Sequence, residues 1–436
     1  MSGGIMRKTR WWRWALASVV LAYATLYVAA AWLRQHNTRR CHQAIAALET
    51  QGYACRPEPI AVGPDAVAHE DFWKRAIAMA SIPREKPKRL QAWLAGTAPD
   101  PGPDAVAWLR DRRAEFADLL AIVRTGGVAL SNANCPAPMA APPPGAPPGM
   151  PLGQWRSEAM SVACAMADWQ RVEALLAEDP APHLAELQLL VRACAPPAGL
   201  IDLFMAIRLH DIRDETTLEV VRLGTAPRQA TEAWLADPIG ASGLLARAWR
   251  GERMQSWATS EWLITYDGGS DASLIDRMNP FGWWFLATLP DGEARRMLDL
   301  ATFEAQAGGR APPSAALGIG GGTSVVYRIA MPNLMESPIS VSEFAQRAHL
   351  RRLAARVILM SRDRGSLPRA QGDLAPGIDP ALLAVGDDHG ATAYVPAGTT
   401  GFVLTSDAST RARRLPAPRT VTPLRIELDM APNGAP

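Results

Sequence analysis

The chain has 436 residues, of which 48% are hydrophobic, so it is long enough to bury more than one core. A formal net charge of +2, with 20% charged residues, excludes a strongly basic or acidic protein, and no nucleic-acid partner is implied. Arginine supplies nearly all of the positive charge, because lysine occurs only at Lys8, Lys74, Lys86 and Lys88. This bias, with abundant alanine and proline, is typical of a GC-rich bacterial genome.

Apolar residues without any charge extend from Trp14 to Leu33, which we name the apolar stretch. As a helix, its roughly twenty residues extend about 30 Å, which matches the hydrocarbon core of a bilayer. The sequence therefore predicts one transmembrane helix that contacts the lipid bilayer through residues 14–33. A basic segment before it predicts a bacterial inner-membrane protein with a cytoplasmic N-terminus and its bulk in the periplasm. The charges of that segment are Arg7, Lys8, Arg10 and Arg13.

Both ends of the apolar stretch carry residues suited to a membrane interface, where an indole ring can be partly solvated by water. We predict interface anchors at Trp11, Trp12, Arg13, Trp14 and Trp32. A cleaved signal peptide is the alternative, because the small residues Ala29-Ala30-Ala31 fit a cleavage site after Ala31. We favour a retained anchor because the apolar run continues through Leu33. Both alternatives export the rest of the chain.

Five cysteines in an exported chain allow disulfides. Cys164 and Cys194 lie almost symmetrically about the break at 179–182, each about fifteen residues, or about 22 Å of helix, from that turn. If the break joins two antiparallel helices, the two cysteines are level, and we hypothesise a Cys164–Cys194 disulfide. The alternative is that both are small buried core residues. Cys41 and Cys55 flank a predicted helix end at Gly52 and form a second possible pair, which leaves Cys135 over.

The fold class that we expect is mainly α: an irregular helical exported domain with one N-terminal transmembrane helix and a small C-terminal α/β unit. A proline-rich stretch separates two helical parts and cannot form a packed core, because proline fixes φ and lacks an N–H donor. In chain order, the predicted segments are a cytoplasmic basic N-terminus (1–13), the transmembrane helix (14–33), a membrane-proximal helical region (34–134), the proline-rich linker or loop (135–153), a helical domain (154–307), a loop-rich connector (308–340), the α/β unit (341–410) and a Pro/Arg-rich tail (411–436).

The helical domain shows amphipathic periodicity without a fixed repeat period, which predicts a series of short helices. We interpret a polar run near Ile212 as a boundary between helices at Gly199–Asp211 and Asp214–Leu223. The pair His210-Asp211 in this run is typical of a solvated, charged helix face.

An aromatic cluster lies within Asn279–Leu289, and its members are Phe281, Trp283, Trp284 and Phe285. Two interpretations stay open for it. The cluster packs in a core or docks the helical domain onto its neighbour, or it makes a second contact with the membrane interface. A further helix is predicted at Asp291–Ala307.

The C-terminal segment changes character. A long helix is predicted at Val341–Arg364, followed by a hairpin formed by β-rich runs at Ala391–Val395 and Gly401–Ser406. This region resembles the C-terminal part of uncharacterised bacterial single-pass envelope proteins, whose tail is similar to that of type II secretion pseudopilins. The resemblance covers about 70 residues and implies a fold more than an activity. The matching residues are Arg364–Pro368, Asp373-Leu374, Asp387–Gly390, Tyr394 and Gly401–Ser406.

The chain contains no zinc-protease, nucleophile-elbow or Cys-x-x-Cys motif. We therefore predict no cofactor and no metal site, and expect a non-enzymatic interaction or assembly module with a possible protein partner in the cell envelope. The alternatives are an exported hydrolase with a site assembled from scattered residues, and an accessory component of a secretion or pilus system.

Overall fold

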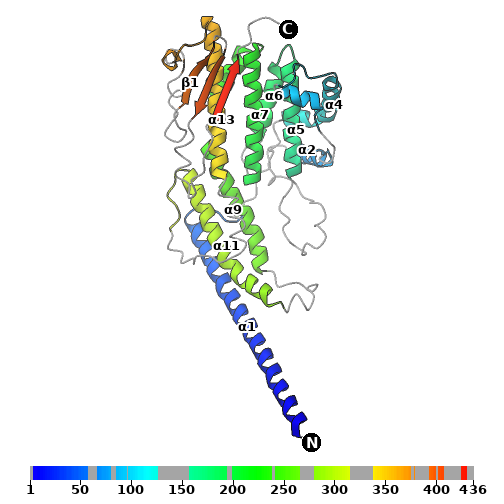
Figure 1. The fold of residues 1–436 in the computed structure, drawn as a ribbon, viewed down its shortest axis with the longest axis vertical. Coiled ribbons are helices and arrows are strands. Elements are labelled where there is room, and N and C mark those ends of the chain that lie inside the picture. Colours follow the sequence, from blue (N-terminus) through cyan, green and yellow to red (C-terminus); the bar gives the residue numbers. More distant parts are fainter. Residues whose placement is uncertain are drawn as a thin grey trace. The chain divides into compact units, whose positions relative to one another are not determined.

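The computed structural model of the chain describes residues 3–56, 66–79, 85–95, 97–125, 157–193, 199–237, 241–265, 279–314, 337–374, 378, 392–398, 401–406 and 424–429. These residues are mainly helical, with one long apolar N-terminal helix and a small antiparallel sheet near the C-terminal end (Figure 1), which confirms the predicted fold class.

The described residues form two compact units that interleave along the chain. The first unit contains those of Met1–Glu58 and Trp249–Met335, and the second contains those of Pro59–Met139, Gln154–Ala248 and Glu336–Pro436. The segments predicted from the sequence are consecutive ranges, whereas these two units interleave along the chain. The predicted segment boundaries therefore stay a prediction.

The first unit is built on α1 (Gly3–Thr50), a helix of 48 residues that extends about 72 Å. Its C-terminal part packs against α11 (Pro280–Ala307), as Figure 1 shows, and contacts α9 (Ala241–Thr265) through Arg34 with Ile264 and His42 with Trp257. We name this packed part the three-helix bundle. As predicted, the helix ends before Gly52, whose φ of 84° is the left-handed conformation that commonly caps helices.

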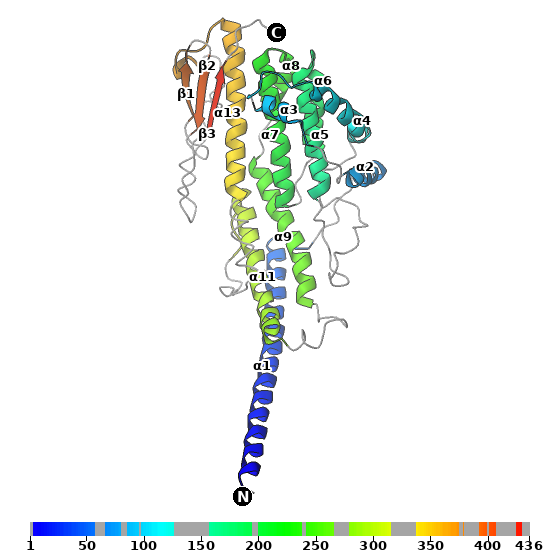
Figure 2. The ribbon, with the colours of Figure 1, turned by 45° about the vertical axis from the view of Figure 1, so that its right-hand side comes forward.

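The second unit contains eight of the described α-helices and the sheet. Figure 2 shows the sheet on one side of α13 and α7 on the other. One apolar core is formed by residues of α2, α3, α4, α5, α6 and α7, and a second by residues of α7, α8, α13, the 3-10 turn before β1 and the sheet. The helices are α2 (Ala66–Met79), α3 (Lys88–Leu94), α4 (Asp104–Arg124), α5 (Ser157–Leu176), α6 (Ala181–Ala193), α7 (Leu200–Leu223), α8 (Arg228–Ala236) and α13 (Ser337–Arg364).

The sheet has the order β1-β2-β3 and both of its pairs are antiparallel. The predicted hairpin is confirmed as β1 (Thr392–Ala397) and β2 (Gly401–Ser406), and a short 3-10 turn (Gln371–Leu374) lies beside β1. A third strand, β3 (Leu424–Asp429), pairs with β2 and lies in the segment that was expected to be a tail. Tyr394, Phe402 and Leu404 of the sheet are buried in the core shared with α13.

Two predicted helix boundaries are wrong. α7 continues through Ile212, where the hydroxyl of Thr216 donates to the carbonyl of Ile212 and the helix is not broken. α11 likewise joins the aromatic cluster to the predicted helix at Asp291–Ala307, with Pro290 inside it. The site in α7 contains no glycine that could end the helix, whereas α11 continues through both Pro290 and Gly292, which are buried.

Candidate functional site

The apolar stretch of α1 is almost entirely exposed. Among the described residues, α1 is the one helix that is long and apolar enough to cross a membrane. Its two hydroxyl side chains make their hydrogen bonds within the helix, since Ser18 donates to the carbonyl of Trp14 at 2.9 Å and Thr25 to that of Leu21 at 2.8 Å. A bare apolar surface of this length is unfavourable in water and suits a lipid environment, where polar groups must be satisfied internally.

The predicted interface anchors lie at the two ends of the exposed part. Trp14 is 73% exposed and Trp32 is 65% exposed. They are eighteen positions apart along the helix, which corresponds to about 27 Å, close to the separation of the two interfaces of a bilayer. Trp11 and Trp12 are in edge-to-face contact, Arg13 is exposed, and Trp32 stacks on His36 with ring centres 5.4 Å apart.

One face of α1 leads from the apolar stretch into the three-helix bundle. Its buried residues recur every three to four positions, or at twice that spacing, as expected for one helical face: Ala30, Asn37, Cys41, Ala44, Ile45 and Leu48. Arg34 donates a hydrogen bond of 2.9 Å to the carbonyl of Ile264, near the C-terminal end of α9. A cation at this end also interacts favourably with the helix dipole. α1 is thus held in the bundle directly beyond the apolar stretch.

Further along the bundle, polar side chains link α9 and α11 to Tyr53, which follows α1. The guanidinium of Arg253 pairs with Glu304, which also pairs with Arg310. Both guanidinium groups lie over the ring of Tyr53, whose hydroxyl donates to the carbonyl of Ala311 at 2.7 Å. The Arg253–Glu304 pair is buried, whereas Arg310 is half exposed, and a buried pair of this kind is weak evidence for stability.

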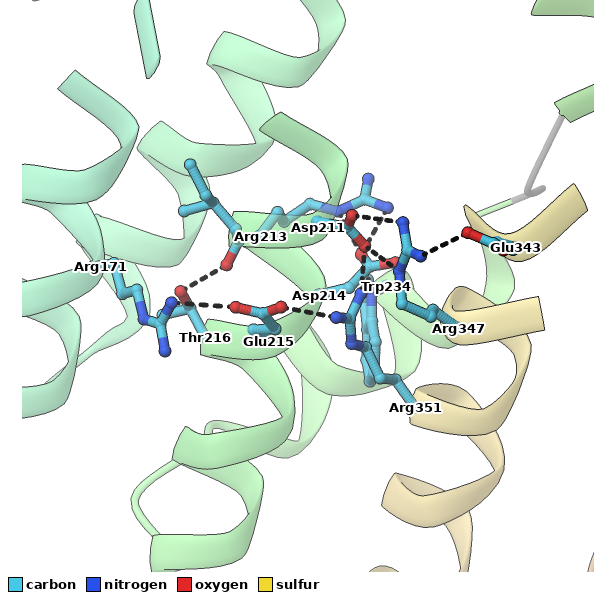
Figure 3. A network of polar contacts seen from close by, with 11 residues as sticks. Arg171, Asp211, Arg213, Asp214, Glu215, Thr216, Trp234, Glu343, Arg347 and Arg351 are labelled. Carbon is cyan, nitrogen blue, oxygen red and sulfur yellow. Dashed lines mark hydrogen bonds and ion pairs between the residues drawn. The ribbon is translucent and has the colours of Figure 1, made fainter. Parts of the chain in front are cut away.

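The second unit contains a larger set of ion pairs, which Figure 3 shows and which we name the arginine–carboxylate network. Asp211 of α7 accepts hydrogen bonds from Arg347 of α13, at 2.9 Å, and from Arg351. Glu215, one helical turn later, accepts from Arg351 at 2.6 Å and from Arg171 of α5 at 2.9 Å. The carboxylates of α7 therefore tie α5 to α13.

A second layer of the network surrounds Asp214. Its carboxylate accepts from Arg213 at 2.8 Å and from the indole of Trp234 in α8, also at 2.8 Å. Arg213 also pairs with Asp237 at 2.8 Å, directly after α8. The interpretation of His210-Asp211 as a solvated face is wrong, because Asp211 is only 8% exposed and faces α13.

The chemistry open to this network is limited by its charge balance. Each carboxylate in it accepts from at least one guanidinium, so these carboxylates are occupied by contacts within the protein. Burial, with some help from Arg213, lowers the pKa of the neighbouring His210 to about 4, so this imidazole is neutral near pH 7. Within the described residues, no group of three His, Cys, Asp or Glu side chains could hold a metal ion. The network is therefore a packing element.

The cysteine predictions have different outcomes. Cys164 is a free cysteine in the structure, so the hypothesised Cys164–Cys194 disulfide gains no support, and Cys194 itself lies outside the described residues. The predicted helix break is confirmed between α5 and α6. The second possible pair is not formed, since Cys41 and Cys55 are both free. Cys41 is buried on the face of α1 that enters the bundle, whereas the thiol of Cys55 donates to the carbonyl of Tyr53.

The chain was compared with known proteins, and no protein-family model, curated protein or solved structure matches it significantly. Sequence reasoning missed Arg34 and Asn37, which hold α1 to its neighbours. Their signal was present, because both polar residues lie on the helical face that Ala30 and Cys41 define.

Proposed function

We propose that the protein is a membrane-anchored component of the bacterial cell envelope that acts as a non-enzymatic interaction or assembly module. Its apolar stretch crosses the inner membrane once, with the N-terminus in the cytoplasm. Both compact units beyond this stretch then face the periplasm.

The continuity of α1 supports the proposal most directly. One unbroken helix contains both the exposed apolar stretch and a buried face of the three-helix bundle. A cleaved signal peptide has no need of such packing, whereas a retained anchor uses it to hold a domain at the membrane. Cleavage after Ala31 would also remove Ala30, the first buried residue of that face.

The arginine–carboxylate network supports a non-enzymatic role in the second unit. Its carboxylates are used in intramolecular ion pairs that join α5, α7, α8 and α13. An enzyme's acid or base instead needs a side chain that is free to exchange a proton with a substrate. The resemblance of the tail to envelope proteins agrees with this proposal.

Membrane fractionation tests the anchor. The full-length chain is expected to stay in the membrane pellet after an alkaline carbonate wash, and mass spectrometry is expected to detect peptides from residues 14–33. A soluble mature product that begins at Trp32 would overturn the proposal of a retained anchor.

Reporter fusions test the orientation. Alkaline phosphatase fused after Pro436 is expected to be active, because it folds only in the periplasm. Changing the four basic residues before the apolar stretch to glutamate is expected to lower that activity, because the positive-inside bias is lost. The matched control changes four exposed arginines of the second unit, Arg89, Arg110, Arg228 and Arg425, and is expected to leave the orientation unchanged.

Cross-linking in intact cells, followed by purification from solubilised membranes, tests the interaction role. A discrete cross-linked species of the full-length protein is expected, and it is expected to be absent for a chain without residues 59–436. A protein that stays an unlinked monomer at every cross-linker concentration would contradict the assembly role.

A further inference from the structure

The first turns of α11 are apolar and face outward. No charged residue occurs from Pro280 to Pro290, and Asp291 is the first charge of the helix. Phe281 is 85% exposed, Trp284 is 55% exposed and Phe285 is 39% exposed. Single exposed apolar residues are common on soluble proteins, but three large aromatic rings on one helix start form a patch that marks an interaction site.

These aromatic residues lie beside the apolar stretch of α1. Trp283 packs edge-on against Tyr23 and Tyr27, with ring centres 5.0 and 4.7 Å apart. Tyr27 and Tyr23 precede Trp32 by five and nine residues, which places their Cα atoms about 7 and 13 Å below it along the helix. If Trp32 marks the interface, Trp283 reaches into the acyl region, at about the depth that interfacial helices occupy.

A buried hydrogen bond joins the two helices close to where their uncharged parts end. Asn37 donates to the carbonyl of Ala287, at the start of the buried polar part of the bundle. On α1, the first charge after the apolar stretch is Arg34, and on α11 it is Asp291, one turn beyond Ala287. The apolar stretch of α1 and residues 280–286 of α11 therefore both lie before this contact, in the same chain direction.

The backbone at the start of α11 is suited to an apolar environment. Exposed N–H groups at a helix start are costly in lipid. Pro280 has no N–H, the N–H of Phe281 donates to the side chain of Asn279 at 3.0 Å, and that of Trp283 donates to the carbonyl of Asn279 at 3.2 Å. The hydroxyl of Thr288 donates to the carbonyls of Trp284 and Phe285, both at 3.1 Å.

We propose that the first two turns of α11, residues 280–287, insert into the leaflet of the bilayer that faces the three-helix bundle, with Phe281, Trp284 and Phe285 against lipid acyl chains. This inference rests on the proposed membrane anchor. It makes the anchor a full span with a second, partial helix beside it, which resists tilting of the bundle on the membrane.

Photo-cross-linking of the full-length protein in nanodiscs tests the proposal. The lipid carries a diazirine in its acyl chain, and adducts are mapped by mass spectrometry. Adducts are expected on residues 281–285 and within the apolar stretch. The control residue is Val106, an exposed apolar residue of α4 in the second unit, where no adducts are expected.

Two results of this experiment would contradict the proposals, and they can be told apart. Adducts in the apolar stretch without adducts at 281–285 would overturn the insertion and leave the anchor intact. An absence of adducts from both segments would overturn the proposed anchor as well.

A variant with Phe281→Asp and Trp284→Asp provides the second measurement. It is expected to lose the adducts at residues 281–285 and to keep those in the apolar stretch, because charge at this depth is unfavourable. The matched control is Val106→Asp, which is expected to keep both. Circular dichroism checks that all three chains have the same helical content.

Discussion

The side-chain amide of Asn37 donates a hydrogen bond of 2.8 Å to the carbonyl oxygen of Ala287, 250 residues further along the chain. The contact is buried and lies where α1 leaves the apolar stretch. Pro290, three residues further along α11, lies inside the helix. This bond joins the anchor helix to the segment that we propose to enter the membrane.

Replacing Asn37 with alanine is expected to destabilise the three-helix bundle by about 1–3 kcal/mol, because a buried hydrogen bond is lost and a small gap is left. Chemical denaturation of the detergent-solubilised protein measures the change. The control is Gln35→Ala on the exposed side of the same helix, for which almost no change is expected. Equal stability of the two variants would show that the bond contributes nothing.

The arginine–carboxylate network leads to a second prediction. Replacing Asp211 with alanine leaves Arg347 and Arg351 without their shared partner in a mostly buried site. A loss of about 3–5 kcal/mol is expected, as for one partner removed from a buried ion pair. Thermal unfolding followed by circular dichroism measures it.

The control for this prediction is Glu343→Ala. Glu343 pairs with Arg347 at 3.9 Å but its side chain is 41% exposed, so a loss of at most about 1 kcal/mol is expected. The prediction fails if the Asp211 and Glu343 variants lose similar stability.

Local patterns in the sequence predicted those parts of the fold that depend on nearby residues. The apolar stretch, the long helix α13 and the β1–β2 hairpin follow from composition, period and turn residues, and all three are present. Strand β3 was missed because its partner, β2, lies before an intervening proline-rich segment of the sequence. No local turn motif between the two strands predicts their pairing.

The polar run in α7 shows why site prediction failed there. Asp211 and Glu215 look like surface residues, since charged residues are rarely buried. Their partners Arg347 and Arg351 come from a helix more than 130 residues later, so the pairs are invisible to any local pattern. One sequence without related sequences does not reveal such a pair.

A third prediction concerns pH. The pKa of His210 is lowered from 6.5 to about 4, mainly by burial. The unfolded chain therefore binds this proton first as the pH falls. The stability contributed by neutral His210 is fully present above pH 6.5 and is lost progressively between pH 6.5 and 4, by about 1–3 kcal/mol.

Replacing His210 with phenylalanine, which suits its edge-on contact with Phe344, is expected to remove this part of the pH dependence. Urea unfolding at several pH values between 4 and 7 measures it. The control is His36→Phe, at an exposed histidine of α1. A His210 variant with the same pH slope as the unmodified protein would contradict the assignment.

The last prediction concerns thiol reactivity. Burial raises the pKa of the Cys41 thiol to about 12 and that of the Cys55 thiol to about 11. Because the thiolate is the reactive form, iodoacetamide at pH 8 is expected to leave both cysteines unmodified in the folded protein and to alkylate both in urea. Mass spectrometry of peptides prepared without reductant measures this. Rapid alkylation of Cys41 in the folded protein would contradict its burial against α11. The same peptides show whether Cys164 is free, as it is in the structure, or linked to Cys194.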